Sequence, residues 1–125
     1  MNDEQLKLAR ELAGHPNFSG RRGMCIVSGR FPLFVMGDGV GYRDLMGGVP
    51  DLTDDATGGV LLGMLGAGWT CEHCEAANGA SVWHVYPRGH TKPPETHFGV
   101  TLAEACARAI LTALLRAHGV ELPSE

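Results

Sequence analysis

The sequence predicts an α+β domain in the order α-ββ-α-ββ-α, with an antiparallel-rich sheet. Three segments repeat apolar residues at helical spacing, and two pairs of short strand-forming runs lie between them, each pair separated by a turn signal. Helices that alternate with hairpins bury their apolar faces on a sheet. We therefore expect a layered helix/sheet/helix sandwich.

The length and composition of the chain fit one folded domain. Its 125 residues are 44% hydrophobic, the proportion of an ordinary globular protein. The 18 glycines are about twice the usual share and indicate many turns. We expect a single domain over residues 1–125.

The first half of the chain predicts a helix followed by a hairpin. A partial apolar stripe predicts the helix over about Asp3–Ala13, and Gly14 ends it. Met24–Val27 and Leu33–Met36 are short apolar runs on either side of a Ser-Gly turn signal, so a hairpin is the simplest interpretation. Tyr42–Met46 is a candidate for a further short strand.

A second helix is predicted after Gly47–Pro50, which we interpret as a loop. Thr53 is the expected N-cap, because its hydroxyl can accept a hydrogen bond from a helix N-terminal amide. Asp54 and Asp55 then lie in the first turn, where the helix dipole favours acidic residues. Four residues make the expected buried stripe: Val60, Leu61, Met64 and Leu65.

Several glycines lie in or just after this second helix. Gly66 or Gly68 is expected to end it. Gly58, Gly59 and Gly63 lie inside it, where each costs about 1 kcal/mol relative to alanine. We interpret these three as positions that pack closely against a sheet.

The next segment predicts a second hairpin. Trp69–Glu75 and Ser81–Tyr86 are rich in strand-forming residues. Asn78-Gly79 between them is a strong turn signal. Pro87–Phe98 is interpreted as a loop.

The closing helix has the strongest pattern in the chain. Thr101 and Glu104 have the spacing of a capping box, and Gly119 is the expected stop. The helix is expected to bury one face over four turns. Eight residues form that face: Leu102, Ala105, Cys106, Ala109, Ile110, Ala113, Leu114 and Ala117.

Charge and hydropathy argue against two classes of partner. The formal net charge is −4 and the only basic cluster is formed by Arg21, Arg22 and Arg30, so we expect no nucleic-acid partner. The first ten residues are polar, and no apolar run approaches the roughly 18 residues of a membrane span. We expect a cytoplasmic protein with no membrane partner and with reduced thiols.

The sharpest local chemical signal is the pair Cys71 and Cys74. Two cysteines at this spacing can hold Zn²⁺, and His90 and His97 in the following loop could complete four ligands. The pair lies in the predicted strand Trp69–Glu75, however, where residues three apart point to opposite faces. We therefore favour ordinary strand thiols, with no cofactor, and keep zinc as an alternative.

No complete catalytic set is found, so we expect a protein that is not an enzyme. Cys25 and Cys106 are interpreted as core thiols. Cys71 and Cys74 lack the helix N-terminal position that favours redox chemistry. A small hydrolase or transferase that uses a cysteine or histidine has no support beyond the presence of those residue types.

The second half of the chain also resembles a known group of small proteins. Pro50–Thr57 leads into a helix with the pattern PD-x-T/S-x-D, Gly68-Trp69 begins a strand, and Thr101–Ala109 opens the closing helix with T-x-x-E-A-x-x-R-A. Over roughly Val49–Ala117 the chain resembles the phage ABA sandwich domain group, small proteins of phage and prophage origin. Residues 1–48 would then be a helix and hairpin extension. The resemblance implies helices on both sides of a sheet and a phage or prophage gene; it carries no established activity and no catalytic residues.

Together these observations favour a phage or prophage accessory protein of the bacterial cytoplasm that binds a host or phage protein. A homodimer is compatible with the sequence. The alternative is a small zinc-stabilised domain built on Cys71 and Cys74.

Overall fold

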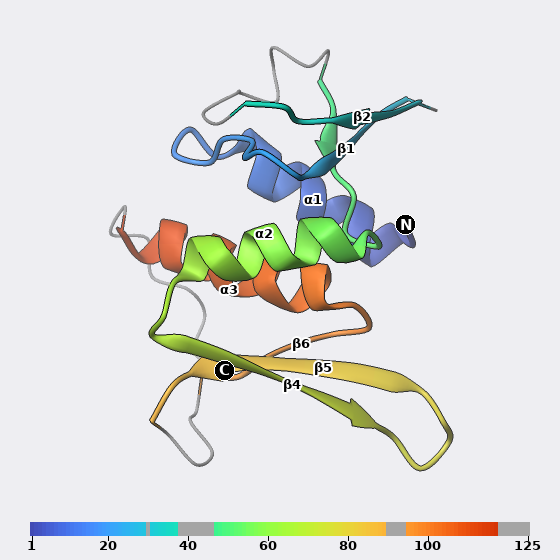
Figure 1. Cartoon of the computed structure of the whole chain (residues 1–125), viewed down its shortest axis with the longest axis vertical. Helices are drawn as coiled ribbons and strands as arrows, with labels where there is room; N and C mark the ends of the chain where they lie inside the picture. Colours follow the sequence, from blue (N-terminus) through green and yellow to red (C-terminus); the bar gives the residue numbers. More distant parts are fainter. Residues whose placement is uncertain (30, 38–46, 90–94, 118–125) are drawn as a thin grey trace.

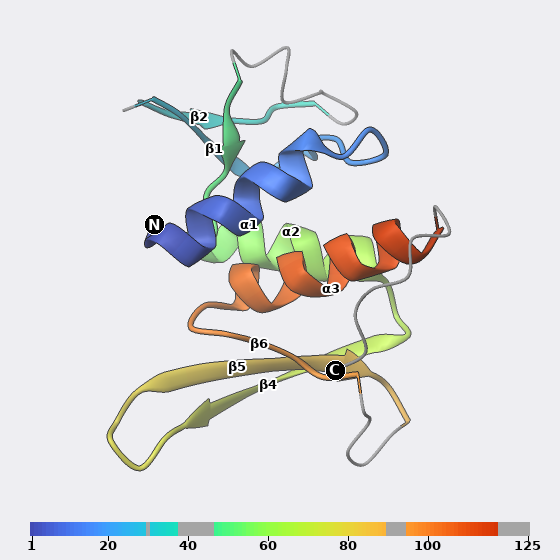
Figure 2. The same ribbon diagram turned by 180° about the vertical axis from the view of Figure 1, so that it is seen from behind.

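The computed structural model describes residues 1–29, 31–37, 47–89 and 95–117. Within these ranges the chain forms three helices and two three-stranded antiparallel sheets. The helices lie between the two sheets (Figures 1 and 2). The predicted α+β class is confirmed, and the element order broadly matches the prediction, with two short strands added. The layering differs from the expected helix/sheet/helix sandwich, because the strands form two sheets and the helices lie between them (Figure 1).

The first sheet has the strand order β2-β1-β3. β1 (Cys25–Ser28) and β2 (Phe31–Phe34) form the predicted hairpin, with Cys25 opposite Phe34. Gly29 has a φ of +62°, a conformation that glycine adopts without steric cost. The turn signal in the sequence therefore has a direct conformational basis.

β3 (Val49–Pro50) pairs with the other side of β1, so that Ile26 lies opposite Pro50. The prediction of a loop at Gly47–Pro50 is wrong for these two residues. A proline cannot donate to a sheet ladder, but an edge strand tolerates it. The strand expected at Tyr42–Met46 lies outside the described residues.

The second sheet contains the other predicted hairpin. β4 (Trp69–Glu75) and β5 (Ser81–Pro87) pair along their whole length. In the turn, Asn78 Oδ1 accepts a hydrogen bond of 3.0 Å from the Ala80 amide. Gly79 has a φ of +83°, as a tight Asn-Gly turn requires.

β6 (His97–Gly99) completes this sheet as an edge strand beside β5. Phe98 lies opposite His84, and His97 lies opposite Val85. The loop predicted for Pro87–Phe98 is therefore wrong at both ends, since Pro87 belongs to β5 and the last two residues of that segment belong to β6. The strand is only three residues long, so its own pattern is weak and its pairing with β5 defines it.

The first two helices have well-formed N-terminal caps. α1 (Asp3–Gly14) begins after Asn2, which forms a reciprocal capping box with Gln5. α2 (Asp55–Leu65) is capped by Asp54, whose Oδ2 accepts a 2.8 Å hydrogen bond from the Thr57 amide.

The prediction of Thr53 as the N-cap of α2 is wrong. The Thr53 hydroxyl donates to Asp51 at 2.6 Å, one turn before the helix starts. The carboxylate of Asp54 accepts the helix amide instead. The predicted end of the helix is confirmed, since its C-cap is Gly66, with a φ of +90°.

α3 (Leu102–Ala117) lies at the centre of the fold and packs against α1, α2, β5 and β6. Thr101 Oγ1 accepts a 3.1 Å hydrogen bond from the Glu104 amide, as its predicted capping role requires. The same hydroxyl donates to the carbonyl of Leu52, which ties the helix start to the segment before α2. The expected stop at Gly119 lies outside the described residues.

Small residues let α3 approach its neighbours closely. Most of its first half is buried, including Ala103, Ala105, Cys106, Ala107 and Ala109. None of the helices in the described ranges is long and apolar enough to cross a membrane.

The interpretation of three α2 glycines as sheet contacts is wrong. A Cβ on Gly58 would lie 3.0 Å from the amide nitrogen of Ala103, so this glycine packs against another helix. Gly59 and Gly63 have open space where a side chain would be. Only one of the three glycines is therefore needed for close packing.

Candidate functional site

The two cysteines of the Cys-x-x-Cys pair lie in β4, where side chains alternate between faces. Cys71 packs against the hydrophobic core. Cys74 is three positions further on and therefore belongs to the other face, where its Sγ lies 3.8 Å from Glu72 Oε1. Regular pairing with β5 continues through both residues, so β4 holds the two sulfurs apart.

His97, one of the two histidines proposed as further zinc ligands, does not join the two cysteines. His97 is buried in β6, and Val85 of β5 lies between His97 and Cys71 in the sheet register. Two strand spacings put the backbones of Cys71 and His97 about 10 Å apart. His90 lies outside the described residues, and no group of three or more His, Cys, Asp or Glu in the described part of the chain could hold a metal ion.

His97 instead belongs to an ionic network that joins β6 to the end of α3. Its Nε2 lies 3.2 Å from Glu95 Oε1, and Arg116 Nη1 lies 2.8 Å from the same oxygen. Burial alone would raise the pKa of the Glu95 carboxyl, but the hydrogen bonds and charges of Arg116 and His97 outweigh burial and lower the pKa. The His97 ring also lies 6.0 Å from the ring of Trp69, between centroids. These contacts fix the position of β6.

The two core thiols are held in the protonated form. Burial and the carboxylates of Asp51 and Asp54 raise the pKa of Cys25. Burial and the charge of Cys71 raise the pKa of Cys106 to about 12. A cysteine nucleophile needs the opposite shift, so this environment suits the structural role expected for both thiols.

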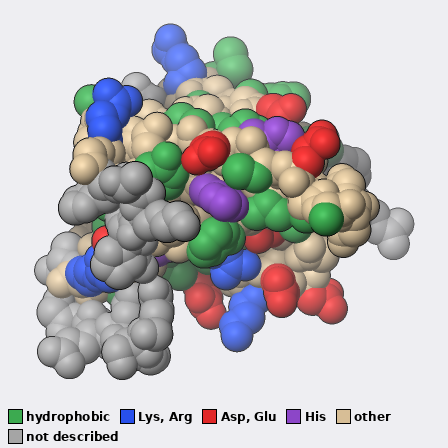
Figure 3. All heavy atoms as spheres, turned by 90° about the horizontal axis from the view of Figure 1, so that it is seen from below, with side chains coloured by type: hydrophobic (Ala, Val, Ile, Leu, Met, Phe, Trp, Pro, Cys, Tyr) green, Lys and Arg blue, Asp and Glu red, His purple; other side chains and the backbone are tan. Residues whose placement is uncertain are grey.

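The second sheet has one face on the helices and one face turned away from them. Alternate residues of its strands, such as Trp69, Cys71 and Trp83, pack against the core. The remaining positions form what we call the outer face: Thr70, Glu72, Cys74, Val82, His84, Tyr86 and Phe98. Figure 3 views the molecule from this side and shows hydrophobic and histidine side chains gathered near the middle of the face.

Aromatic contacts organise the outer face. The rings of His84 and Phe98 meet edge to face, with centroids 4.9 Å apart. Tyr86 Oη donates to Glu72 Oε2 at 3.4 Å. Phe98 nevertheless remains 52% exposed, and Val100 just beyond it is 59% exposed. The edge of the sheet thus presents two exposed apolar side chains.

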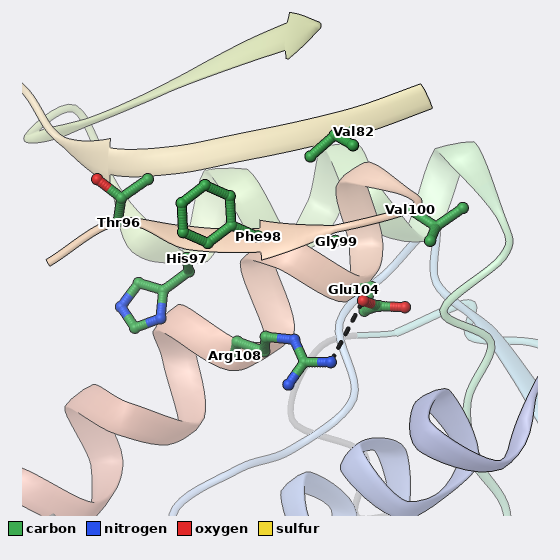
Figure 4. Close-up of a pocket in the computed structure, with 8 residues that line it drawn as sticks. All are labelled: Val82, Thr96, His97, Phe98, Gly99, Val100, Glu104 and Arg108. Carbon is green, nitrogen blue, oxygen red and sulfur yellow. Dashed lines mark hydrogen bonds and ion pairs between the residues drawn. The ribbon is translucent and has the colours of Figure 1, made fainter. Parts of the chain in front are cut away.

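A groove of about 520 Å³ lies along β6, between the sheet and α3. We call it the β6 groove, and its lining residues are Val82, Thr96, His97, Phe98, Gly99, Val100, Glu104 and Arg108. In Figure 4, Phe98 lies on the side of β5, and Glu104 and Arg108 lie on the side of α3. Gly99 lies so close to the start of α3 that a Cβ there would come 2.5 Å from the Ala105 amide nitrogen.

Two residues that line the β6 groove, Glu104 and Arg108, lie one turn apart on α3 and form an ion pair. Arg108 Nη2 lies 3.3 Å from Glu104 Oε2. The Glu104 side chain is only 6% exposed, whereas the Arg108 side chain is 38% exposed. The charge that a ligand would meet in the groove is therefore positive.

Sequence reasoning missed the β6 groove. His97, Phe98, Gly99 and Val100 alternate between buried and exposed positions in the structure, but their residue types show no such alternation. The one sequence signal is the spacing of Glu104 and Arg108, which predicts an ion pair on a helix. That these two segments face each other is a tertiary feature.

Comparison of the chain with protein-family models, with curated proteins and with solved structures gives no match.

Proposed function

We propose that this protein is a non-enzymatic binding module, and that an extended segment of a partner protein binds along the edge of β6 that faces away from β5. The observation that carries the proposal is the edge strand itself, because it lines the β6 groove, contains the exposed Phe98 and is followed by the exposed Val100. Large exposed apolar side chains beside a groove are typical of binding surfaces.

The physical basis is strand addition. Backbone groups of alternate residues in an antiparallel strand point to opposite edges. β6 pairs with β5 on one side, and no strand among the described residues pairs with its other side, so that side can offer hydrogen bonds. An extended partner segment would satisfy those groups and gain specificity from its side chains. The network of Glu95, His97 and Arg116 would hold β6 ready for this pairing.

The resemblance to the phage ABA sandwich domain group supports a host or phage protein as the source of that segment. It also supports the bacterial cytoplasm as the place where the two meet. The proposal needs neither a metal nor a catalytic residue.

Selection of a phage-displayed random heptapeptide library against the full chain tests the proposal. Enriched peptides are then measured by fluorescence polarisation against the wild type, Phe98→Asp and Phe34→Asp. Phe34 is the matched control, because it is an exposed phenylalanine of the other sheet, 69% accessible.

We expect binding to the wild type and to Phe34→Asp, and at least a roughly tenfold loss with Phe98→Asp, the effect of removing a central apolar contact. Far-UV circular dichroism of each variant verifies the fold. Absence of any enriched peptide, or equal loss in both variants, would count against β6 as the binding edge.

A further inference from the structure

The β6 groove has two chemically different sides. A strand added next to β6 continues the pleat, so its side chains alternate between the outer face and the side of α3. Those on the outer face would lie beside Phe98 and Val100, which are apolar and more than half exposed. Those on the other side would point toward α3, where Arg108 lines the groove.

The accessible charge on the α3 side comes from Arg108. A guanidinium has five N–H donors, and the ion pair with Glu104 uses the Nη2 nitrogen. Because Glu104 is nearly buried beneath the pair and Arg108 is not, an incoming group meets the arginine. An arginine fork can bridge two carboxylates, and such charge-assisted hydrogen bonds are the stronger ones.

We infer that the partner segment carries an acidic side chain, aspartate or glutamate, between two apolar residues. The apolar residues lie against Phe98 and Val100, and the acidic residue pairs with Arg108. This inference rests on the proposed function and adds the chemistry of the partner to it.

Substitution of Glu104 provides a second, independent test of the pairing between Arg108 and an acidic ligand. Its carboxylate competes with an acidic ligand for Arg108, since both bind the same guanidinium. Glu104→Gln removes that competition with little change of shape. Arg108→Gln removes the positive charge itself. The two variants should therefore change the affinity for an acidic peptide in opposite directions.

The experiment uses the peptides enriched on the wild-type chain and a matched set in which the central acidic residue is replaced by its amide. With the wild type, the acidic peptides should bind about tenfold more tightly than their amide counterparts, roughly the effect of one good charge pair. Their affinity should fall as NaCl is added, because salt screens an exposed pair.

With Arg108→Gln, we expect the acidic preference and the salt dependence to disappear while the amide peptides bind as before. With Glu104→Gln, we expect the acidic peptides to bind more tightly. Thermal unfolding of both variants separates these effects from a loss of fold.

Three results would overturn the inference. Enriched peptides without an acidic preference would leave the proposed function standing and remove Arg108 from it. An acidic preference that survives Arg108→Gln would place the charge recognition elsewhere. A concentration-dependent dimer in sedimentation, broken by Phe98→Asp, would show that a second copy of the chain occupies the edge.

Discussion

Gly58 of α2 lies against the backbone of Ala103 in α3, so closely that a Cβ on the glycine would come 3.0 Å from the Ala103 amide nitrogen. The side chain of Leu102 is nearly as near, at 3.2 Å. The contact lets the two helices approach at the centre of the fold. Gly59, one position later, faces open space.

This difference makes Gly58→Ala and Gly59→Ala a matched pair. We expect Gly58→Ala to lower the free energy of unfolding by about 1 kcal/mol, because overpacking outweighs the gain in helix propensity. Gly59→Ala should raise it by up to about 1 kcal/mol. Urea denaturation measures both, and equal shifts in the two variants would contradict the close helix contact.

Thr57 connects the start of α2 to β1. Its hydroxyl accepts a 2.8 Å hydrogen bond from the Cys25 amide and donates one of 2.8 Å to Asp54. Thr57→Val keeps the shape but leaves a buried amide without a partner, so we expect a loss of about 1–3 kcal/mol in unfolding free energy. Thr53→Val is the control: its residue is exposed, and its change should stay within about 0.5 kcal/mol. Similar losses in the two variants would show that the buried hydrogen bond contributes little.

Local sequence signals account for most of the elements. Asn78-Gly79 marks the turn between β4 and β5, and Thr101 starts α3, because both effects act within a few residues. The two shortest strands, β3 and β6, depend on pairing with β1 and β5, which lie more than ten residues away. Because β3 pairs with β1 and β6 pairs with β5, the strands form two separate sheets, one on each side of the helices. Such non-local contacts leave little trace in a short stretch of sequence.

The same distinction applies to the candidate site. Strand alternation correctly separates Cys71 from Cys74, because that is a local property of β4. The β6 groove joins Phe98 to Arg108 of α3 through tertiary packing. Sequence reasoning identified the residues that are chemically conspicuous and missed those that the fold brings together.

The lowered pKa of Glu95 has a consequence for stability. A carboxyl whose pKa is lower in the folded state stabilises the fold above its unfolded pKa, near 4.3, and loses that contribution as the pH falls through the folded value. The stability gap between the wild type and Glu95→Gln should therefore be widest near neutral pH and shrink in acid. We expect a gap of less than about 1 kcal/mol, because Arg116 is 55% exposed.

Urea denaturation of the wild type and Glu95→Gln across this pH range measures the gap. Glu72→Gln, on the outer face, is the control, and its difference from the wild type should change less. A stability gap that widens in acid would mean that Arg116 and His97 do not stabilise the ionised Glu95 carboxylate in the folded state.

The zinc alternative makes a separate prediction. Because β4 puts Cys71 and Cys74 on opposite faces, we expect no stoichiometric zinc in tag-free protein by elemental analysis. Cys74→Ser should leave the unfolding transition almost unchanged, since its thiol is at the surface of the sheet. If the wild type contained stoichiometric zinc and Cys74→Ser lost it, this segment would have to form a zinc knuckle and not a regular strand.

Thiol reactivity distinguishes the buried cysteines from the one on the outer face. Alkylation requires the thiolate, and burial with the charge of Cys71 raises the pKa of Cys106 to about 12. At mildly alkaline pH we expect iodoacetamide to modify Cys74 in the native protein, and to modify Cys106 and Cys25 only after unfolding in urea. Peptide mass spectrometry at successive times identifies each site. Rapid modification of Cys106 in the native state would mean that α3 separates from the second sheet often enough to expose the centre of the fold, which would also undo the β6 groove.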